Sequence, residues 1–149
     1  MNGKLEIGKE FTGKCLTVTD YHVNAFAGLT MDFNPLHVDK EYADRTRFRG
    51  RIAHGLLSLS ISLGLISELI HGYFLYGFNK VRFLSPVRPG DTVCSHLRVD
   101  SKNEKGEFTL YYCTLTLKRN ESTVLISEMI IGEERNNHDD SKISTGTEN

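Results

Sequence analysis

The chain has almost no net charge, few cysteines and no long apolar segment. The formal net charge is −1, from 18 Lys and Arg against 19 Asp and Glu, so the basic face typical of nucleic-acid binders is not indicated. The longest uncharged apolar stretch, residues 55–67, is too short to cross a bilayer. Residues 1–11 show no apolar core of a secretory signal. We therefore expect a cytoplasmic protein with no nucleic-acid partner and no membrane insertion.

The three cysteines, Cys15, Cys94 and Cys113, are odd in number and far apart in the chain. Disulfide-rich scaffolds carry an even number of cysteines, and zinc sites use paired Cys-x-x-Cys motifs. Neither pattern is present. We expect three reduced cysteines in small buried or half-buried positions, with neither a disulfide framework nor a metal site.

Local patterns in the first third of the chain predict short helices separated by loops. Thr19 or Asp20 can cap a first helix. That helix cannot run far past Met31, because Pro35 lacks a backbone N–H and disfavours helix at the residue before it. Residues 32–37 are therefore predicted to form a loop. Asp39 can then cap a brief helical turn over residues 40–43, followed by a basic loop over residues 44–51.

The rest of the chain predicts one long helix and then strands. Residues 56–70 are apolar nearly all round, and a soluble helix of that kind is enclosed by other structure. Alternating patterns predict strands near residues 15–18 and over 73–83, 92–99, 108–118 and 123–131. We expect one α+β domain over residues 1–132, in which a curved antiparallel sheet wraps a long central helix. Residues 133–149 are predicted to be a polar, disordered tail.

The sheet of such a domain leaves an edge and a far face uncovered. Proteins protect such edges, commonly by pairing with a second copy. A homodimer or a higher homo-oligomer is therefore expected.

The strongest chemical signal is Asp32-Phe-Asn-Pro-Leu-His37. The proline bend can turn the Asp32 carboxylate and the His37 imidazole toward one point, where they would make an acid–base pair around a water molecule. Gly55 opens the second helix, whose first turn has unpaired N–H groups and a partial positive charge. A carbonyl oxygen placed there would be polarised.

Structural interpretations of the same residues stay open at this point. Asp and Asn-Pro are common in turns, and His54 could be a buried structural histidine. Asp32, His37, Asp39 and His54 could be imagined as metal ligands, but no spacing typical of a metal site supports them. Met31, Phe33 and the leucines of the second helix could line either the core or an acyl pocket.

Two stretches carry a family resemblance. Asp32-Phe-Asn-Pro-Leu-His37-Val-Asp39, continued by Ile52-Ala-His-Gly-Leu-Leu57, resembles the hydratase 2 motif of MaoC-like proteins, and most of all the (R)-specific enoyl-CoA hydratases. Residues 81–91, Val-Arg-Phe-Leu-Ser-Pro-Val-Arg-Pro-Gly-Asp, are similar to the segment that follows the central helix in that family. The resemblance covers residues 5–132.

The resemblance implies a hot-dog fold, assembly as at least a dimer, and reversible hydration of a trans-2-enoyl-CoA to a (3R)-3-hydroxyacyl-CoA. It implies that Asp32 and His37 activate water and that the Gly55 N–H holds the thioester oxygen. It further places Phe33, Asn34, His54, Leu63 and Arg82 at the substrate, with Leu63 standing where some relatives have a serine. No metal or other cofactor is implied, because coenzyme A arrives as part of the substrate.

Three alternatives remain beside this hypothesis. A (3R)-hydroxyacyl-ACP dehydratase would use the same chemistry on an acidic carrier protein. The basic residues at its pocket mouth would be Arg45, Arg47, Arg49 and Arg51, which could equally bind the phosphates of coenzyme A. A hot-dog thioesterase and a non-catalytic acyl-thioester-binding protein are the other two. The acyl group, whether short, long or dicarboxylic, is not indicated by the sequence.

Overall fold

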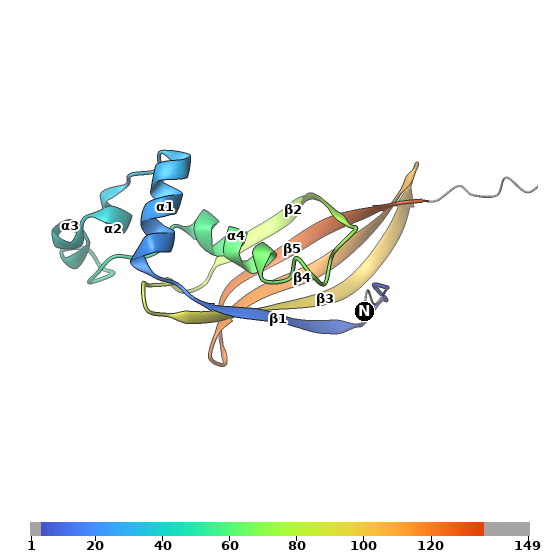
Figure 1. The fold of residues 1–149 in the computed structure, drawn as a ribbon. Helices are drawn as coiled ribbons and strands as arrows, with labels where there is room; N and C mark the ends of the chain where they lie inside the picture. Colours follow the sequence, from blue (N-terminus) through green and yellow to red (C-terminus); the bar gives the residue numbers. More distant parts are fainter. Residues whose placement is uncertain (1–3, 136–149) are drawn as a thin grey trace, which may run out of the picture.

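A five-stranded antiparallel sheet curves around one helix in the computed structural model, which describes residues 4–135 (Figure 1). The strand order is β1-β3-β4-β5-β2, so β3, β4 and β5 form consecutive hairpins and the two edges are β1 and β2. Buried and less buried residues alternate along β4, as they do in a strand with one face on a core. The strands are β1 Glu10–Thr17, β2 Phe74–Phe83, β3 Thr92–Lys105, β4 Phe108–Arg119 and β5 Ser122–Glu134.

Four helices complete the domain: α1 Asp20–Thr30, α2 Pro35–Val38, α3 Lys40–Asp44 and α4 Gly55–Gly64. Thr19 caps α1 as predicted, and the Asp39 carboxylate accepts a hydrogen bond from the Tyr42 N–H to cap α3. Figure 1 shows α1, α2 and α3 grouped at one end of the molecule, beside the start of α4. The chemistry-bearing residues of the first third of the chain therefore gather at that end.

Two local predictions were wrong in their boundaries. Residues 35–37 are not loop, because Pro35 takes the first position of α2, where a missing N–H costs no helical hydrogen bond. The central helix ends at Gly64 rather than near residue 70. Beyond it the Leu65 carbonyl accepts a hydrogen bond from the Lys14 N–H of β1, at 2.9 Å, and the Leu69 N–H bonds the Ile66 carbonyl instead. Residues 65–72 form turns instead.

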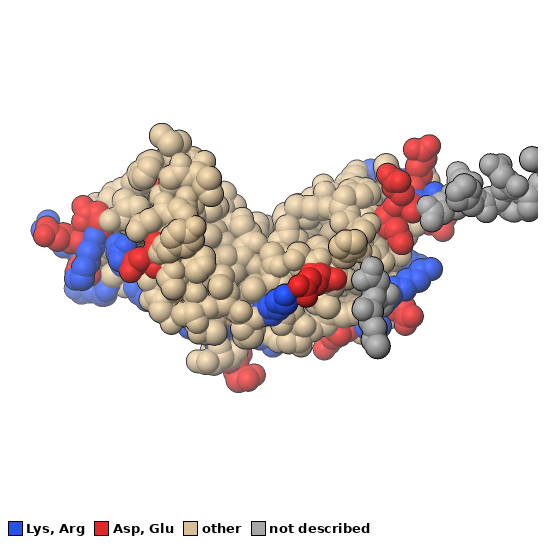
Figure 2. Space-filling view, in the orientation of Figure 1, with Lys and Arg blue, Asp and Glu red and all other residues tan. Residues whose placement is uncertain are grey.

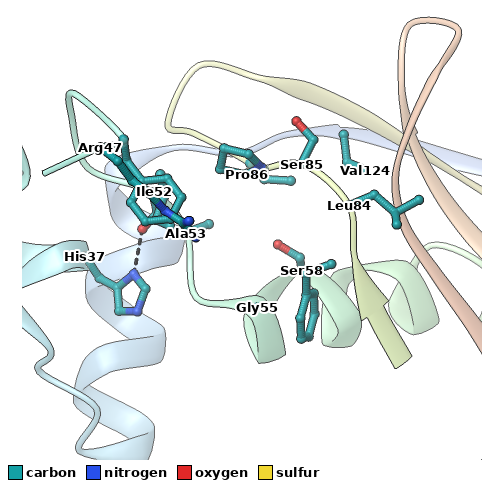
Figure 3. A pocket seen from close by; sticks show the side chains of 13 residues that line it. His37, Arg47, Ile52, Ala53, Gly55, Ser58, Leu84, Ser85, Pro86 and Val124 are labelled. Carbon is teal, nitrogen blue, oxygen red and sulfur yellow. Dashed lines mark hydrogen bonds between the residues drawn. The ribbon is translucent and has the colours of Figure 1, made fainter. Parts of the chain in front are cut away.

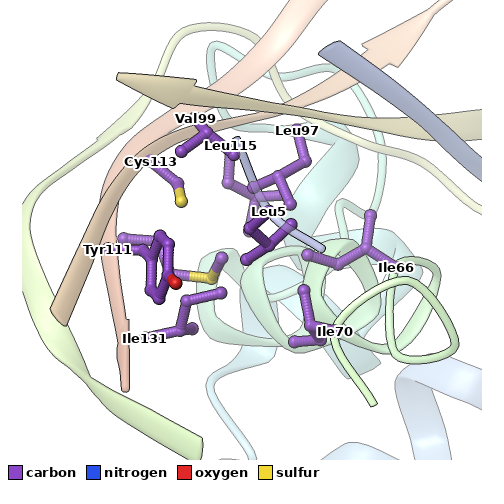
Figure 4. Packing of buried hydrophobic residues seen from close by; sticks show 10 residues of the cluster. Leu5, Ile66, Ile70, Leu97, Val99, Tyr111, Cys113, Leu115 and Ile131 are labelled. Carbon is purple, nitrogen blue, oxygen red and sulfur yellow. The ribbon is translucent and has the colours of Figure 1, made fainter. Parts of the chain in front are cut away.

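The hydrophobic core has two parts along the sheet. One part packs residues after α4, such as Ile66 and Ile70, against Leu97, Leu115 and Ile131 of the strands (Figure 4). The other joins Val23 of α1 and Leu57 of α4 to strand residues near the helical end. Burying each such aliphatic side chain contributes about 1.5–3 kcal/mol, so the second part anchors the helical end of the domain, which includes the Asp32 loop and His37 of α2.

The cysteine expectation is corrected by the structure. Cys15 of β1 and Cys94 of β3 form a disulfide, because the antiparallel register places them directly opposite each other although they are 79 residues apart. Spacing along the chain does not reveal such a pair. Cys113 is free and buried, and burial raises the pKa of its thiol to about 12. This thiol is therefore protonated and unreactive at neutral pH.

The face of the molecule drawn in Figure 2 has most of its charged side chains at the two ends. In this view few Lys, Arg, Asp and Glu side chains lie around the concave middle part between the two ends. No helix within residues 4–135 is long and apolar enough to cross a membrane. Strand β5 continues through Glu134, beyond the expected domain end at residue 132, and residues 136–149 of the expected tail lie outside the described residues.

Candidate active site

The loop that carries Asp32 is shaped by the C-terminal cap of α1, a hydrogen bond within the loop and the N-terminal cap of α2. Met31 ends α1 in the left-handed conformation (φ 62°), which turns the chain sharply. The Asp32 carboxylate then accepts a hydrogen bond from the Asn34 N–H at 3.2 Å. The Asn34 side chain accepts in turn from the Leu36 N–H at 3.0 Å and caps α2. These local bonds place His37 one helical turn after the loop.

His37 is buried, and one carbonyl sets its tautomer. Its Nδ1 lies 2.7 Å from the Ile52 carbonyl oxygen, visible as the dashed line in Figure 3. A carbonyl can only accept, so Nδ1 carries the proton and Nε2 keeps a lone pair. Burial lowers the pKa of His37 and is the largest effect. The hydrogen bond to the Ile52 carbonyl raises the pKa by less, and the still smaller effects of His54 and Asp32 lower and raise it, respectively. His37 is therefore neutral at pH 7, with Nε2 available as a base.

His54 joins the two predicted catalytic residues. Its Nε2 donates to the Asp32 main-chain oxygen at 3.0 Å, and its ring stacks on His37 with centroids 3.9 Å apart. One ligand atom each from Asp32, His37 and His54 lie within 4.8 Å of one another. The His54 side chain is buried, and its Nδ1 has no hydrogen-bond partner among residues 4–135. The tertiary fold therefore brings together three residues that the sequence separates by up to 22 positions.

The same three groups could be considered as metal ligands. Their imidazole rings are inclined by only 31°. Stacked rings direct their lone pairs along similar planes, whereas a tetrahedral ion needs ligands that converge on one point. Asp39, the fourth conceivable ligand, uses its carboxylate to cap α3. The geometry thus suits proton transfer better than ion binding.

Gly55 lies at the start of α4, so its N–H has no partner within the helix. It lines a cavity of about 430 Å³ together with His37, Arg47, Phe48, Ile52, Ala53, Ser58, Val124 and residues 83–87. Figure 3 shows His37, Gly55 and Ser58 around the same space. The volume lies in the range of small-molecule sites. A neutral base and a free N–H at a helix start therefore share one pocket.

None of the five other residues predicted at the substrate lines this pocket, and neither does Asp32. Asn34 is exposed and caps α2, and Phe33 is exposed beside Asp32. Leu63 packs against the core cluster around Ile66. Arg82 lies on the outer sheet surface with Lys80 and Glu128. Its neighbour Phe83 lines the cavity, since successive strand residues point to opposite faces.

Some pocket residues were missed from the sequence. Phe83 and Ser58 line the cavity. The ring of Phe83 is so close to Gly55 that a Cβ built on the glycine would lie 2.9 Å from it. The hydroxyl of Ser58 donates to the His54 carbonyl. The alternation of β2 could have indicated Phe83, since it puts Phe83 on the face opposite Arg82.

Comparisons with known proteins agree with this fold. A family model described as a MaoC like domain matches residues 4–118. An (R)-specific enoyl-CoA hydratase of Rhodospirillum rubrum is 34% identical over 116 residues, which are 74% of this chain and 81% of the relative. A mitochondrial 3-hydroxyacyl-(acyl-carrier-protein) dehydratase of Arabidopsis thaliana is 30% identical over 105 residues, 70% of this chain and 63% of the relative.

The likeness extends to solved structures. The structure of an (R)-hydratase from A. caviae involved in PHA biosynthesis aligns with a TM-score of 0.73 and 27% identity, covering 89% of this chain and 98% of that chain. The chain therefore belongs to the MaoC-like family, and its fold is the hot-dog fold of MaoC-like hydratases. The family resemblance and the fold class predicted from the sequence are both confirmed. The relatives include a hydratase and a dehydratase of acyl thioesters, so the family points to hydro-lyase chemistry.

Proposed function

We propose that the protein hydrates trans-2-enoyl-CoA thioesters reversibly to (3R)-3-hydroxyacyl-CoA, with Asp32 and His37 as the acid–base pair. The observation that carries this proposal is the His37 geometry. Its Nδ1–H is held by the Ile52 carbonyl, which leaves Nε2 unprotonated in a pocket shared with the Gly55 N–H. The Asp32 carboxylate lies within 4.8 Å of this imidazole. Both requirements of hydration, a base for water and a donor for the thioester oxygen, are thereby met.

The reaction follows from these positions. The water oxygen bonds to C3 of the enoyl group while its proton passes to His37 Nε2 and the Asp32 carboxylate orients the water. The electron pair of the double bond moves toward the thioester carbonyl, whose oxygen accepts a hydrogen bond from the Gly55 N–H. A proton from the Asp32–His37 pair then bonds to C2. One water is added across the double bond, and the pair returns to its starting protonation. No metal or other cofactor takes part in this scheme.

The homodimer predicted from the sequence remains part of this proposal. Edge strand β2 carries exposed Phe74, Leu75 and Tyr76, and long apolar edges are usually paired or covered. Met31 and Phe33, on the loop around Asp32, are also exposed. We expect sedimentation velocity to give about twice the chain mass of 16.9 kDa. A sedimenting species of monomer mass at micromolar concentration contradicts this expectation.

A cytoplasmic location is also proposed, although the Cys15–Cys94 disulfide is unusual for a reducing compartment. Fractionation of the native host cells, with the thiol state trapped by alkylation at lysis, tests it. Recovery in the soluble cytoplasmic fraction supports the location. Recovery with secreted or periplasmic proteins contradicts it.

The central experiment follows the loss of conjugated enoyl-thioester absorbance with enoyl-CoAs of graded chain length. We expect turnover by the wild type and a loss of at least about 100-fold in kcat for Asp32→Asn and for His37→Ala, in line with general acid–base contributions. Matched controls are Glu121→Gln and His71→Ala, which change an exposed carboxylate and an exposed histidine away from the pocket. Unchanged rates in both catalytic variants would refute the site assignment. Lack of turnover on every enoyl thioester would favour a non-catalytic binding protein.

The second candidate is dehydration of (3R)-hydroxyacyl groups on acyl carrier protein. The arginines of residues 45–51, close to the pocket, favour an acidic partner of some kind. Parallel assays with the same acyl group on coenzyme A and on carrier protein distinguish the two. A kcat/KM at least tenfold higher on the carrier protein supports the dehydratase.

A further inference from the structure

Residues 88–91, Arg-Pro-Gly-Asp, form a tight turn before β3 and do not line the cavity of the candidate active site. The Asp91 N–H donates to the Arg88 carbonyl at 3.0 Å, and Gly90 has a φ of 98°. Proline followed by glycine at the two central positions is the sequence that a type II turn favours. The turn belongs to the stretch that resembles the family, but the reaction proposed above gives it no role.

An ion pair fixes this turn to the sheet. The Asp91 carboxylate accepts a hydrogen bond from the Arg88 N–H at 2.9 Å and another from the Arg119 guanidinium of β4 at 2.7 Å. Arg119 also donates to the Pro86 carbonyl at 3.1 Å. The Arg119 and Asp91 side chains are only 30% and 22% exposed, so these charge-assisted bonds are partly shielded from water. The main chain of Arg88 is therefore held in place relative to β4.

The Arg88 side chain is half-buried and reaches from the turn to the loop between α3 and α4. Its Nη2 donates to the Phe48 carbonyl, and its Nη1 lies 3.5 Å from the Arg51 carbonyl oxygen. Gly50 has a φ of 148°, and a Cβ there would lie 3.1 Å from the Arg88 Nη1. The loop thus packs closely on the guanidinium. One side chain bonds two carbonyls of the segment that leads into Ile52.

A main-chain bond from the residue before Arg88 aims the Ile52 carbonyl. The Ala53 N–H donates to the Val87 carbonyl at 2.7 Å. The C=O of Ile52 and the N–H of Ala53 belong to one planar trans peptide unit, in which they point in opposite directions. Fixing the N–H on Val87 therefore directs the Ile52 carbonyl the other way, to His37 Nδ1 at 2.7 Å (Figure 3). Val87 and Arg88 together hold the peptides on both sides of Ile52.

We propose that Arg88 is a positioning residue for the His37 imidazole and acts through the Ile52 carbonyl. This inference rests on the proposed function, in which His37 Nε2 takes a proton from water. Without the guanidinium, the carbonyls of Phe48 and Arg51 lose their donor, and the loop has to turn them toward water. The Ile52 carbonyl then shifts with its neighbour. His37 is freed to carry its proton on Nε2, the tautomer that cannot act as the base.

The first test measures the coupling between Arg88 and His37 in crotonyl-CoA hydration. Arg88→Met keeps an unbranched stem without donors, and we expect kcat to fall about 10–100-fold, as for a displaced catalytic group. In the His37→Ala background, the same substitution should lower kcat by less than about twofold, because residues that act through one another are not additive. Arg88→Lys, a single point charge in place of a fork, should retain part of kcat. Arg98→Gln, an exposed arginine on β3, is the control and should leave kcat unchanged.

The second test determines the His37 tautomer by nitrogen-15 NMR and needs no turnover. The His37 signals are assigned by their absence from the spectrum of His37→Ala. At neutral pH we expect the proton on Nδ1 in the wild type and in Arg98→Gln, and a mixture of both tautomers in Arg88→Met. Urea unfolding shows whether each variant is folded. If Arg88→Met is not folded, Arg88→Lys takes its place and should show a smaller share of the second tautomer.

Several results would overturn the positioning role. One is an unchanged kcat in Arg88→Met, and another is a loss of kcat that is as large in the His37→Ala background as in the wild type. An unchanged His37 tautomer in the folded Arg88 variant also overturns it. Lack of turnover by the wild type refutes the proposed function instead. The tautomer then decides the positioning role by itself, since a mixture in the variant supports that role.

Discussion

Replacing Gly55 by alanine tests two roles that we assign to this glycine at the start of α4, one of them proposed above and one seen in the packing. The first is the proposed catalytic role, in which a thioester oxygen approaches the Gly55 N–H closely. The second is packing, because the Phe83 ring occupies the space beside the glycine. Three ring atoms of Phe83 lie 2.9–3.0 Å from the position of a Cβ at residue 55, closer than real Cβ contacts allow. One substitution therefore disturbs both roles, and a second one is needed to tell them apart.

The expected magnitudes differ between the two roles. Forcing an extra methyl group against Phe83 should lower the free energy of unfolding by about 1–3 kcal/mol, the usual cost of overpacking. Phe83 is 52% exposed, so its ring can move partly into solvent and the lower end of that range is expected. Displacing the thioester oxygen from its N–H donor should lower kcat by about 10²–10³-fold, as for loss of one donor to an oxyanion.

The assay is a double-substitution cycle read by urea unfolding and by enoyl-CoA hydration. Phe83→Leu removes the ring atoms that meet the new methyl group, so Gly55→Ala with Phe83→Leu should regain most of the lost stability while kcat stays low. Gly64→Ala is the matched control on the same helix, since a Cβ there meets nothing within 4 Å. It should change stability by less than about 1 kcal/mol, in the favourable direction. Full recovery of kcat in the double variant would show that Gly55 serves packing alone and would refute its role at the thioester.

Four further predictions concern the histidines and the cysteines. Because burial lowers the pKa of His37 below its usual 6.5, kcat/KM should be level above pH 6.5 and fall below it; an acid limb centred above pH 7 contradicts this. The unfolded chain binds the His37 proton more readily, so the free energy of unfolding should also decrease as the pH falls below 6.5. Urea unfolding of the wild type and of His37→Gln across that pH range should show a smaller decrease in the variant. His54→Phe keeps a ring beside His37 but removes the donor to the Asp32 carbonyl, so kcat should fall about 10-fold with little change in KM; a changed KM with an unchanged kcat would point to substrate contact instead. Thiol titration of the unfolded, unreduced protein should find one thiol, Cys113, while three would show that Cys15 and Cys94 are not bonded.

Local order in the helical end of the domain was predictable because it depends on neighbouring residues. Thr19, Asp39 and Pro35 act through caps and a missing N–H, which operate over three or four positions. The strands were predictable from alternation, although β3 extends to Lys105, beyond the predicted end at residue 99. The proximity of Asp32 and His37 was predictable because both residues lie on one short stretch whose bend is set by Pro35.

Other features depended on contacts between distant parts of the chain. The end of α4 was mispredicted, and there the Leu65 carbonyl bonds the Lys14 N–H, on a strand far away in sequence that the local pattern does not reveal. Leu63 packs into the core, while Ser58, one turn earlier on the same helix, lines the pocket. Helical periodicity indicates which residues share a face, but the neighbours of that face are set by the sheet.

The sequence by itself determined the family, the candidate acid–base residues and the glycine at a helix start, because these are carried by a short motif with local geometry. The tertiary structure alone decided how those groups are tuned. Ile52, 15 residues from His37, selects the imidazole nitrogen that stays free, and Phe83 comes to Gly55 from the opposite edge strand. Likewise Asp20 forms an ion pair with Arg51, whereas Arg45, Arg47 and Arg49 form none within the described residues. Hydrogen bonds, ring packing and ion pairs act over a few ångströms in space, and only the folded chain brings these residues that close.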